Sequence, residues 1–147
     1  PNAEDEALWA AVHETGKPVV VSTAYLTVET VAARHNSKVT PLRCVARYPA
    51  PVGDYGLGEW ATAMHGRPWG ISDHTIGSAT AVAAVALGAT VVEKHICLTE
   101  HPKSPDSGVH SMSPKQFYHL VQDCREAARA VTGRAVVSEP QPGRIIW

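Results

Sequence analysis

Two short stretches decide the fold: Gly70-Ile71-Ser72-Asp73-His74 and Val91-Val92-Glu93-Lys94-His95. Each begins with apolar or small residues and ends in polar residues, with a histidine last. Short apolar runs of this kind are typical of strands that are buried on both faces. A segment rich in alanine and valine, residues 78–87, separates them and ends at Gly88. The two stretches therefore predict parallel strands that are joined by a helical crossover.

The same alternation continues toward the N-terminus. Residues 17–23 and 39–45 have the β-branched composition of strands, although Pro41 weakens the second. The prolines and glycine of residues 47–54 predict a loop. Ser113, Pro114 and Gln116 form the N-terminal signature of a last helix, with a capping box. The helices that we expect cover residues 4–14, 27–36, 57–65, 78–87 and 114–131.

Four strands that alternate with helices indicate an α/β protein with a parallel sheet. A doubly wound dinucleotide fold is disfavoured, because no G-x-G-x-x-G follows the first strand. A complete TIM (β/α)8 barrel takes about 250 residues. The chain has 147 residues, so about four βα units would make half of such a barrel. We expect residues 1–133 to form this partial domain and residues 134–147 to be a linker or tail.

Composition excludes several classes of function. Hydrophobic residues make up 44% and charged residues 18%, with a net charge of −1, which predicts a globular domain and no broad surface for nucleic acid or membrane. No apolar run is long enough for a transmembrane helix, and we expect no signal peptide. Cys44, Cys97 and Cys124 have no C-x-x-C spacing, so a cytoplasmic location is expected. The first residue is Pro1, and we expect the chain to be cut from a longer one.

The strand ends carry the candidate chemistry. Side chains at positions i and i+2 of a strand share a face, so Ser72 and His74 should point one way, as should Glu93 and His95. Neighbouring strands would bring the two histidines together, where they suit a divalent transition metal, with Glu93 as a general base. The alternatives are hydrogen-bonded structural histidines and a surface charge cluster. An unpaired charge in a buried strand is costly, which favours a functional reason.

Three further residues are weaker candidates. Ser22, at the end of the first strand, has a hydroxyl that can donate to a carboxylate or phosphate, or it belongs to a plain turn before a helix. Tyr48 lines a substrate pocket or covers the end of the sheet as a loop aromatic. Asp106 binds a substrate hydroxyl or makes a turn in its Pro/Ser-rich loop.

Several segments together resemble a known family. They are residues 16–23 (GKPVVVST), 47–51 (RYPAP), 70–77 (GISDHTIG), 84–95 (AVALGATVVEKH) and 105–114 (PDSGVHSMSP). They are similar, in one consistent order from residue 4 to residue 132, to motifs of the N-acetylneuraminate (sialic acid) synthases, which include pseudaminic and legionaminic acid synthases. The "SDHT" and "EKH" motifs at this spacing carry most of the resemblance, which places the chain in the C-terminal half of the family's barrel.

The resemblance implies a metal-dependent condensation of phosphoenolpyruvate with the open-chain aldehyde of an N-acyl hexosamine, with loss of phosphate by C–O cleavage. It implies that His74 and His95 bind the metal, most often Mn²⁺, with Mg²⁺ or Co²⁺ as alternatives, and that Glu93 is the candidate base for a water molecule. The residues that match Ser22 and Ser72 hold phosphoenolpyruvate, and those that match Tyr48 and Asp106 contact the sugar.

The chain also departs from the family pattern. The family's "STGM" is Ser22-Thr23-Ala24-Tyr25, Ala46 replaces an asparagine that contacts phosphoenolpyruvate, and Arg43 replaces a histidine. By this resemblance we expect the first four barrel strands and the C-terminal antifreeze-like domain of the family to lie outside these 147 residues. We therefore expect an incomplete site, which needs a missing N-terminal half-barrel or self-association. The alternatives are a catalytically inactive half-barrel fragment and a metal-dependent barrel aldolase.

Overall fold

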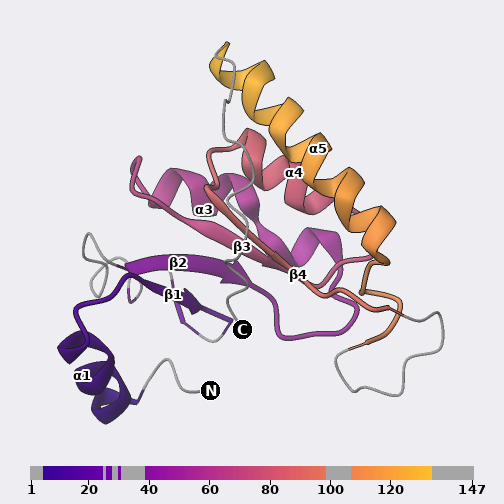
Figure 1. Ribbon diagram of the computed structural model, residues 1–147. Coiled ribbons are helices and arrows are strands. Elements are labelled where there is room, and N and C mark those ends of the chain that lie inside the picture. The colour runs from indigo at the N-terminus through magenta and orange to yellow at the C-terminus, as the bar shows by residue number, and fades with distance from the viewer. Residues whose placement is uncertain (1–4, 25, 28–29, 31–38, 99–106, 134–147) are drawn as a thin grey trace.

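The computed structural model describes residues 5–24, 26–27, 30, 39–98 and 107–133. Four strands form one parallel sheet in the order β1-β2-β3-β4 (Figure 1). The sheet confirms the prediction of an α/β protein with consecutive parallel strands. The strands are β1 Val19–Ser22, β2 Val39–Cys44, β3 Gly70–Asp73 and β4 Val91–Lys94.

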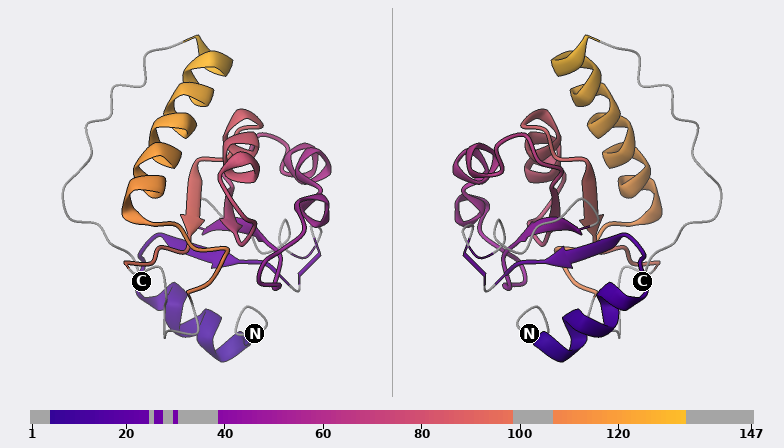
Figure 2. Two further views of the ribbon diagram at one scale, coloured as in Figure 1. Left: turned by 90° about the vertical axis from the view of Figure 1, so that its right-hand side faces the viewer. Right: turned by 90° about the vertical axis from the view of Figure 1, so that its left-hand side faces the viewer.

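The helices lie mainly on one face of this sheet. Figure 2 shows α3, α4 and α5 on one side and α1 on the other. Asp5 caps α1, and Ser113 and Gln116 form the predicted capping box of α5. Among the described residues, no helix is long and apolar enough to cross a membrane. The helices are α1 Glu6–Glu14, the 3-10 helix η2 Val52–Tyr55, α3 Leu57–Ala63, α4 Ala79–Ala86 and α5 Pro114–Thr132.

The structure bears on three sequence predictions. The loop predicted over residues 47–54 is wrong at its end, because Val52–Tyr55 form a turn of 3-10 helix. The helix expected over residues 27–36 lies mostly outside the described residues. Pro41 is accommodated inside β2, because β2 pairs with β3 only from Leu42 onward. The proline therefore precedes the part of the strand that is paired on both sides.

The main core lies between the sheet and the helices α3 and α4. Trp60 and Trp69 are buried there together with Ile71 of β3. A second cluster joins α4 to α5 through Ala81, Met112 and Leu120. Val92 of β4 packs against both clusters, which lie on the face of the sheet that also carries Ile71.

The opposite face carries the side chains that matter for function. The register pairs Ser22 with Leu42, Leu42 with Gly70, and Gly70 with Val91, so these four share one face. Gly70 is needed at the centre of this row. A Cβ atom there would lie 2.5 Å from Leu42 Cδ2 and 2.5 Å from the Val91 carbonyl oxygen. Because Gly70 has no side chain, Leu42 and the backbone of β4 can approach it closely.

We predict that Gly70→Ala lowers the free energy of unfolding by about 1–3 kcal/mol, because the added methyl group forces Leu42 and the β4 backbone apart. Urea unfolding measures the change. The matched control is Gly58→Ala in α3, where the added methyl group has no atom within 4 Å, and alanine is the better helix former. Equal losses in the two variants would contradict this account of the row.

Candidate functional site

The two strand-end histidines meet as the sequence predicts. Asp73 and Lys94 are the last paired residues of β3 and β4, and His74 and His95 directly follow them. The two imidazole rings lie 5.3 Å apart between centroids and stand edge to face at 74°. The parallel register is the cause, since it brings equivalent strand ends to the same edge of the sheet.

The position of the proton on His74 follows from its partners. Its Nδ1 lies 2.7 Å from the Val45 carbonyl oxygen, which can only accept, so Nδ1 carries the hydrogen. The pKa of His74 is lowered below its ordinary value, mainly by burial. The ring is therefore neutral at neutral pH. The lone pair of a neutral ring protonated at Nδ1 lies on Nε2, which is 3.3 Å from Ser72 Oγ. A backbone-anchored ring with a lone pair on Nε2 is the usual form of a metal-binding histidine.

A row of polar side chains lies beside the histidines. Ser72 Oγ donates a hydrogen bond to Glu93 Oε1 at 2.5 Å. The two residues are register partners on the face away from the helices, and Glu93 is exposed. Cys44 of β2 is the next member of the row, and burial raises the pKa of its thiol. This thiol is protonated at neutral pH, which leaves the Glu93 carboxylate as the base of the row.

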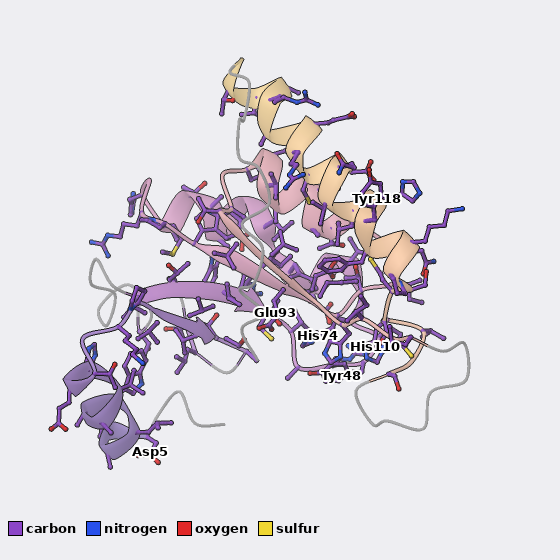
Figure 3. The ribbon with its side chains drawn as sticks, viewed as in Figure 1. Asp5, Tyr48, His74, Glu93, His110 and Tyr118 are labelled. Atoms are coloured by element: carbon purple, nitrogen blue, oxygen red, sulfur yellow. The ribbon has the colours of Figure 1, made fainter. Side chains whose placement is uncertain are left out.

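Tyr48 covers the histidine pair. Its ring stacks on His74 at 4.2 Å and meets His95 edge-on at 5.5 Å. The Tyr48–Pro49 peptide bond is cis, and the tyrosine is 56% exposed. Figure 3 shows Tyr48, His74 and Glu93 gathered at the carboxyl ends of the strands. Tyr48 is therefore placed to face a molecule that enters the site.

His110 belongs to this cluster, and sequence reasoning missed it. Its ring lies 4.9 Å from the ring of His95 and 5.0 Å from that of Tyr48 (Figure 3). The segment that carries it is fastened to the end of β4, because Met112 N donates to the His95 carbonyl and Cys97 N donates to the Met112 carbonyl. The sequence gives no signal for this, since His110 follows no strand and lies in a loop rich in serine and glycine.

The remaining candidates are not brought to the histidines. Ser22 is exposed on the same face, but it pairs with Leu42 and so lies two residues earlier along the strands than Ser72. Asp106 lies outside the described residues. Asp73 and Lys94 point to the helix side, as strand alternation predicts, but the sequence did not reveal that they form a buried ion pair.

Tyr55 is a second residue that the sequence did not single out. Its buried hydroxyl donates to the Ser72 carbonyl at 2.9 Å and accepts from the His74 backbone N–H at 2.8 Å. Burial raises the pKa of this phenol well above its usual range. Arg43 holds the preceding turn, donating to the carbonyls of Tyr55 and Asp54. Tyr55 therefore fixes the backbone on both sides of Asp73.

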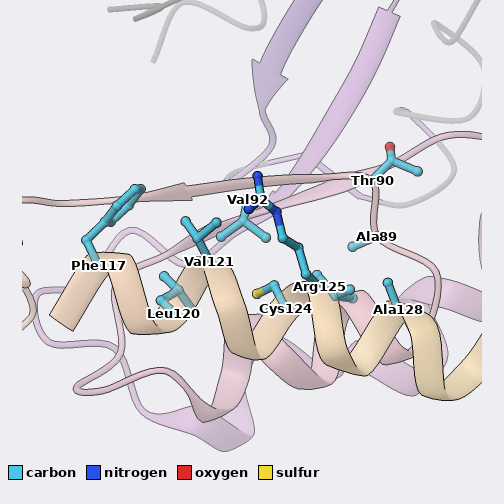
Figure 4. A pocket seen from close by; sticks show the side chains of 10 residues that line it. Ala89, Thr90, Val92, Phe117, Leu120, Val121, Cys124, Arg125 and Ala128 are labelled. Atoms are coloured by element: carbon cyan, nitrogen blue, oxygen red, sulfur yellow. The ribbon is translucent and has the colours of Figure 1, made fainter. Parts of the chain in front are cut away.

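A hollow of about 430 Å³ on the helix side is separate from this cluster. It lies between β4, α4 and α5 and is lined mainly by apolar side chains, among them Val92, Phe117 and Val121 (Figure 4). Val92 faces the helices, whereas Glu93 faces the other way. Burial raises the pKa of Cys124 in its wall to about 11, so this thiol is protonated at neutral pH.

Comparison with known proteins adds an independent finding. Residues 2–136 match the model of the NeuB family. The chain is 31% identical to the pseudaminic acid synthase of Helicobacter pylori, over 80% of this chain and 37% of that protein. It is 33% identical to the N-acetylneuraminate-9-phosphate synthase of Homo sapiens, over 79% of this chain and 34% of that protein.

A solved structure is similar as well. The crystal structure of the N-acetylneuraminic acid synthetase of Leptospira borgpetersenii serovar Hardjo-bovis, in complex with citrate, superposes with a TM-score of 0.74 at 29% identity. The match covers 92% of this chain and 50% of that one. The chain thus spans about a third of the curated relatives named above and half of this solved one.

We predict that Tyr55→Phe lowers the free energy of unfolding by about 1–3 kcal/mol, because it leaves the buried His74 N–H without its acceptor. Urea unfolding measures this loss. Tyr118→Phe is the matched control: Tyr118 is 61% exposed on α5, and the same change there should stay within about 0.5 kcal/mol. A Tyr55→Phe variant as stable as this control would show that the hydroxyl bridge does not hold the β3 end.

Proposed function

The chain belongs to the NeuB family, and from this premise we propose that it supplies the metal-binding part of a nonulosonic acid synthase. The reaction is the condensation of phosphoenolpyruvate with an N-acyl hexosamine. The chain contributes about four βα units, the C-terminal half of a (β/α)8 barrel. The observation that carries the proposal is the meeting of His74 and His95 beside Glu93 at the carboxyl ends of parallel strands, where such folds bind ligands.

The histidine pair suits a divalent metal such as Mn²⁺, with Mg²⁺ or Co²⁺ as alternatives. His74 is neutral, anchored through Nδ1 and carries its lone pair on Nε2. Within the described part of the chain, no three His, Cys, Asp or Glu side chains are grouped to hold one ion. His74 and His95 are thus two of the ligands, and others come from substrate oxygens or water. When bound, the metal acts as a Lewis acid that polarises the aldehyde carbonyl.

The other residues of the site supply the base and the substrate contacts. Once C3 of phosphoenolpyruvate has formed the bond to the aldehyde carbon, a water molecule adds to C2, from which phosphate then leaves. This water must lose a proton, and the Glu93 carboxylate accepts it. Ser72 holds that carboxylate in place through its short hydrogen bond. Ser72 and Ser22 lie on one face of the sheet, and we assign their hydroxyls to phosphoenolpyruvate. Tyr48, with its exposed ring over His74, contacts the sugar, and Asp106 is the second sugar contact.

The site needs further strands to be complete. Within the described residues, β1 and β4 each pair with one strand, so both edges of the sheet are open. Val20, on the face of the site, is 44% exposed. Among the described strand residues, the side chains on that face include no lysine or arginine that could neutralise a phosphate. We propose that an N-terminal half-barrel, or a second copy of the chain, closes the sheet and supplies them.

The same openness supports a second candidate, a half-barrel that binds metal without turning over substrate. A different metal-dependent barrel aldolase is the third candidate. The three differ in what they predict. The synthase requires phosphoenolpyruvate and releases phosphate, the aldolase does not, and the inactive half-barrel binds metal with no turnover under any condition.

We predict that the chain binds Mn²⁺ and that His74→Ala/His95→Ala weakens this binding at least about 10-fold, since loss of supporting residues alone costs that much at metal sites. Isothermal titration calorimetry at neutral pH measures the affinity. The control is His13→Ala/His119→Ala, because both of these histidines are exposed and lie on α1 and α5. If both double variants bind Mn²⁺ like the parent, the metal site is wrongly assigned.

We predict no release of phosphate by the chain alone, and turnover when a separately produced N-terminal half of the Helicobacter pylori relative is added. Phosphate release from phosphoenolpyruvate, with Mn²⁺ and an N-acyl hexosamine, is the assay. Glu93→Gln in the complemented mixture should abolish turnover, because it removes the base. Sedimentation identifies the active species. Turnover that survives Glu93→Gln contradicts the assigned role, and a folded monomer that stays inactive with the added half favours the inactive half-barrel.

A further inference from the structure

The strand ends that carry the two histidines are joined by an ion pair that has no role in the chemistry proposed above. Lys94 Nζ lies 3.1 Å from Asp73 Oδ2, and neither side chain has any exposed surface. By contrast, the ion pair of Arg129 with Glu126 on α5 has side chains that are 53% and 71% exposed. The charges of the Asp73–Lys94 pair are therefore fully withdrawn from water, whereas those of the Arg129–Glu126 pair are not.

A fully buried ion pair is poorly explained by stability alone. Withdrawing two charges from water is costly, and apolar replacements of similar volume are often as stable or more stable. Ala81 and Leu120 are buried between α4 and α5 on this side of the sheet, so apolar packing is available to the chain. A geometric role accounts for the charges better than a simple gain in stability.

The pair has the contacts that such a role requires. Lys94 Nζ also donates to the Thr75 carbonyl, and Asp73 Oδ1 accepts from the Thr75 backbone N–H at 2.8 Å. The Thr75 hydroxyl donates to Thr80 in α4 at 3.1 Å. These bonds hold the backbone on both sides of His74. Since Asp73 and Lys94 are the last register partners of β3 and β4, the same pair fixes where His95 starts relative to His74.

We propose that Asp73 and Lys94 are positioning residues for the histidine pair: their ion pair sets the two strand ends so that the rings of His74 and His95 meet in a fixed arrangement. The Tyr55 hydroxyl holds the same strand end through the Ser72 carbonyl and the His74 N–H. The ion pair provides what Tyr55 does not, a direct link from β3 to β4. The proposal rests on the proposed function insofar as the purpose of the arrangement is to bind metal.

The test replaces both charges at once with Asp73→Asn/Lys94→Met. Asparagine keeps an acceptor for the Thr75 N–H, and methionine fills most of the space of lysine. We expect a folded variant whose urea midpoint is close to that of the parent, but whose Mn²⁺ affinity is about 10- to 100-fold weaker, as for loss of outer-shell partners at other metal sites. The matched control is Glu126→Gln/Arg129→Gln, which removes the exposed pair and should change neither quantity.

A second readout separates this proposal from the metal assignment. The rings of His74 and His95 are close enough for nuclear Overhauser contacts between their protons, which can be recorded with no metal added. We expect these contacts in the parent and their loss in the double variant. If the parent fails to bind Mn²⁺ through its histidines, the metal assignment fails, and the ring contacts alone decide the positioning role. Ring contacts that are retained in the folded double variant overturn it.

Should the double variant fail to fold, Asp73→Asn/Lys94→Gln takes its place. This pair of changes removes both charges and leaves neither one buried alone. The asparagine oxygen still offers an acceptor to the Thr75 N–H, and the glutamine amide offers a donor to the Thr75 carbonyl. Weaker Mn²⁺ binding together with weaker ring contacts, in a folded protein, supports the proposal. Parent-like values of both in this folded variant overturn it.

Discussion

The structure depends on the parallel register of β3 against β4. Ser72 pairs with Glu93 and Asp73 with Lys94, and these pairings bring His74 and His95 together. The side chains of Ser72 and Glu93 lie on the face of the sheet away from α3, α4 and α5, where Ser72 donates to Glu93. The side chains of Asp73 and Lys94, one residue further along, face these helices and form a buried ion pair. His74 and His95 follow these residues in the sequence and therefore meet just beyond the last paired residues of β3 and β4.

Much of this could be predicted from the sequence, because strand periodicity is local. The order of strands, the two faces of Ser72-Asp73-His74 and Glu93-Lys94-His95, and the helix start at Ser113 all follow from patterns within a few residues. The resemblance to the sialic acid synthases was confirmed by the match to the NeuB family. What could not be predicted depends on contacts between distant segments. His110 reaches the site because Met112 is fastened to the His95 carbonyl, and no local pattern encodes that contact.

The role of Tyr55 could not be predicted from the sequence either. Its place in the sequence, after a proline- and glycine-rich loop, predicts only irregular backbone. Its role arises because Arg43 holds the 3-10 turn and directs the hydroxyl to β3. Arg43 itself, where the family pattern has a histidine, lies against Trp60 on the helix side and not in the site. That departure from the family pattern therefore leaves the histidine pair unaltered.

The central claim is that His74 and His95 together bind one divalent metal ion. The most direct measurement is electron spin echo spectroscopy of Mn²⁺ bound to the chain, which detects nitrogen ligands of the ion. The account predicts couplings from two imidazole nitrogens, with one lost in His74→Ala and one in His95→Ala. An ion that shows oxygen ligands alone, or nitrogen couplings that both variants retain, would contradict it.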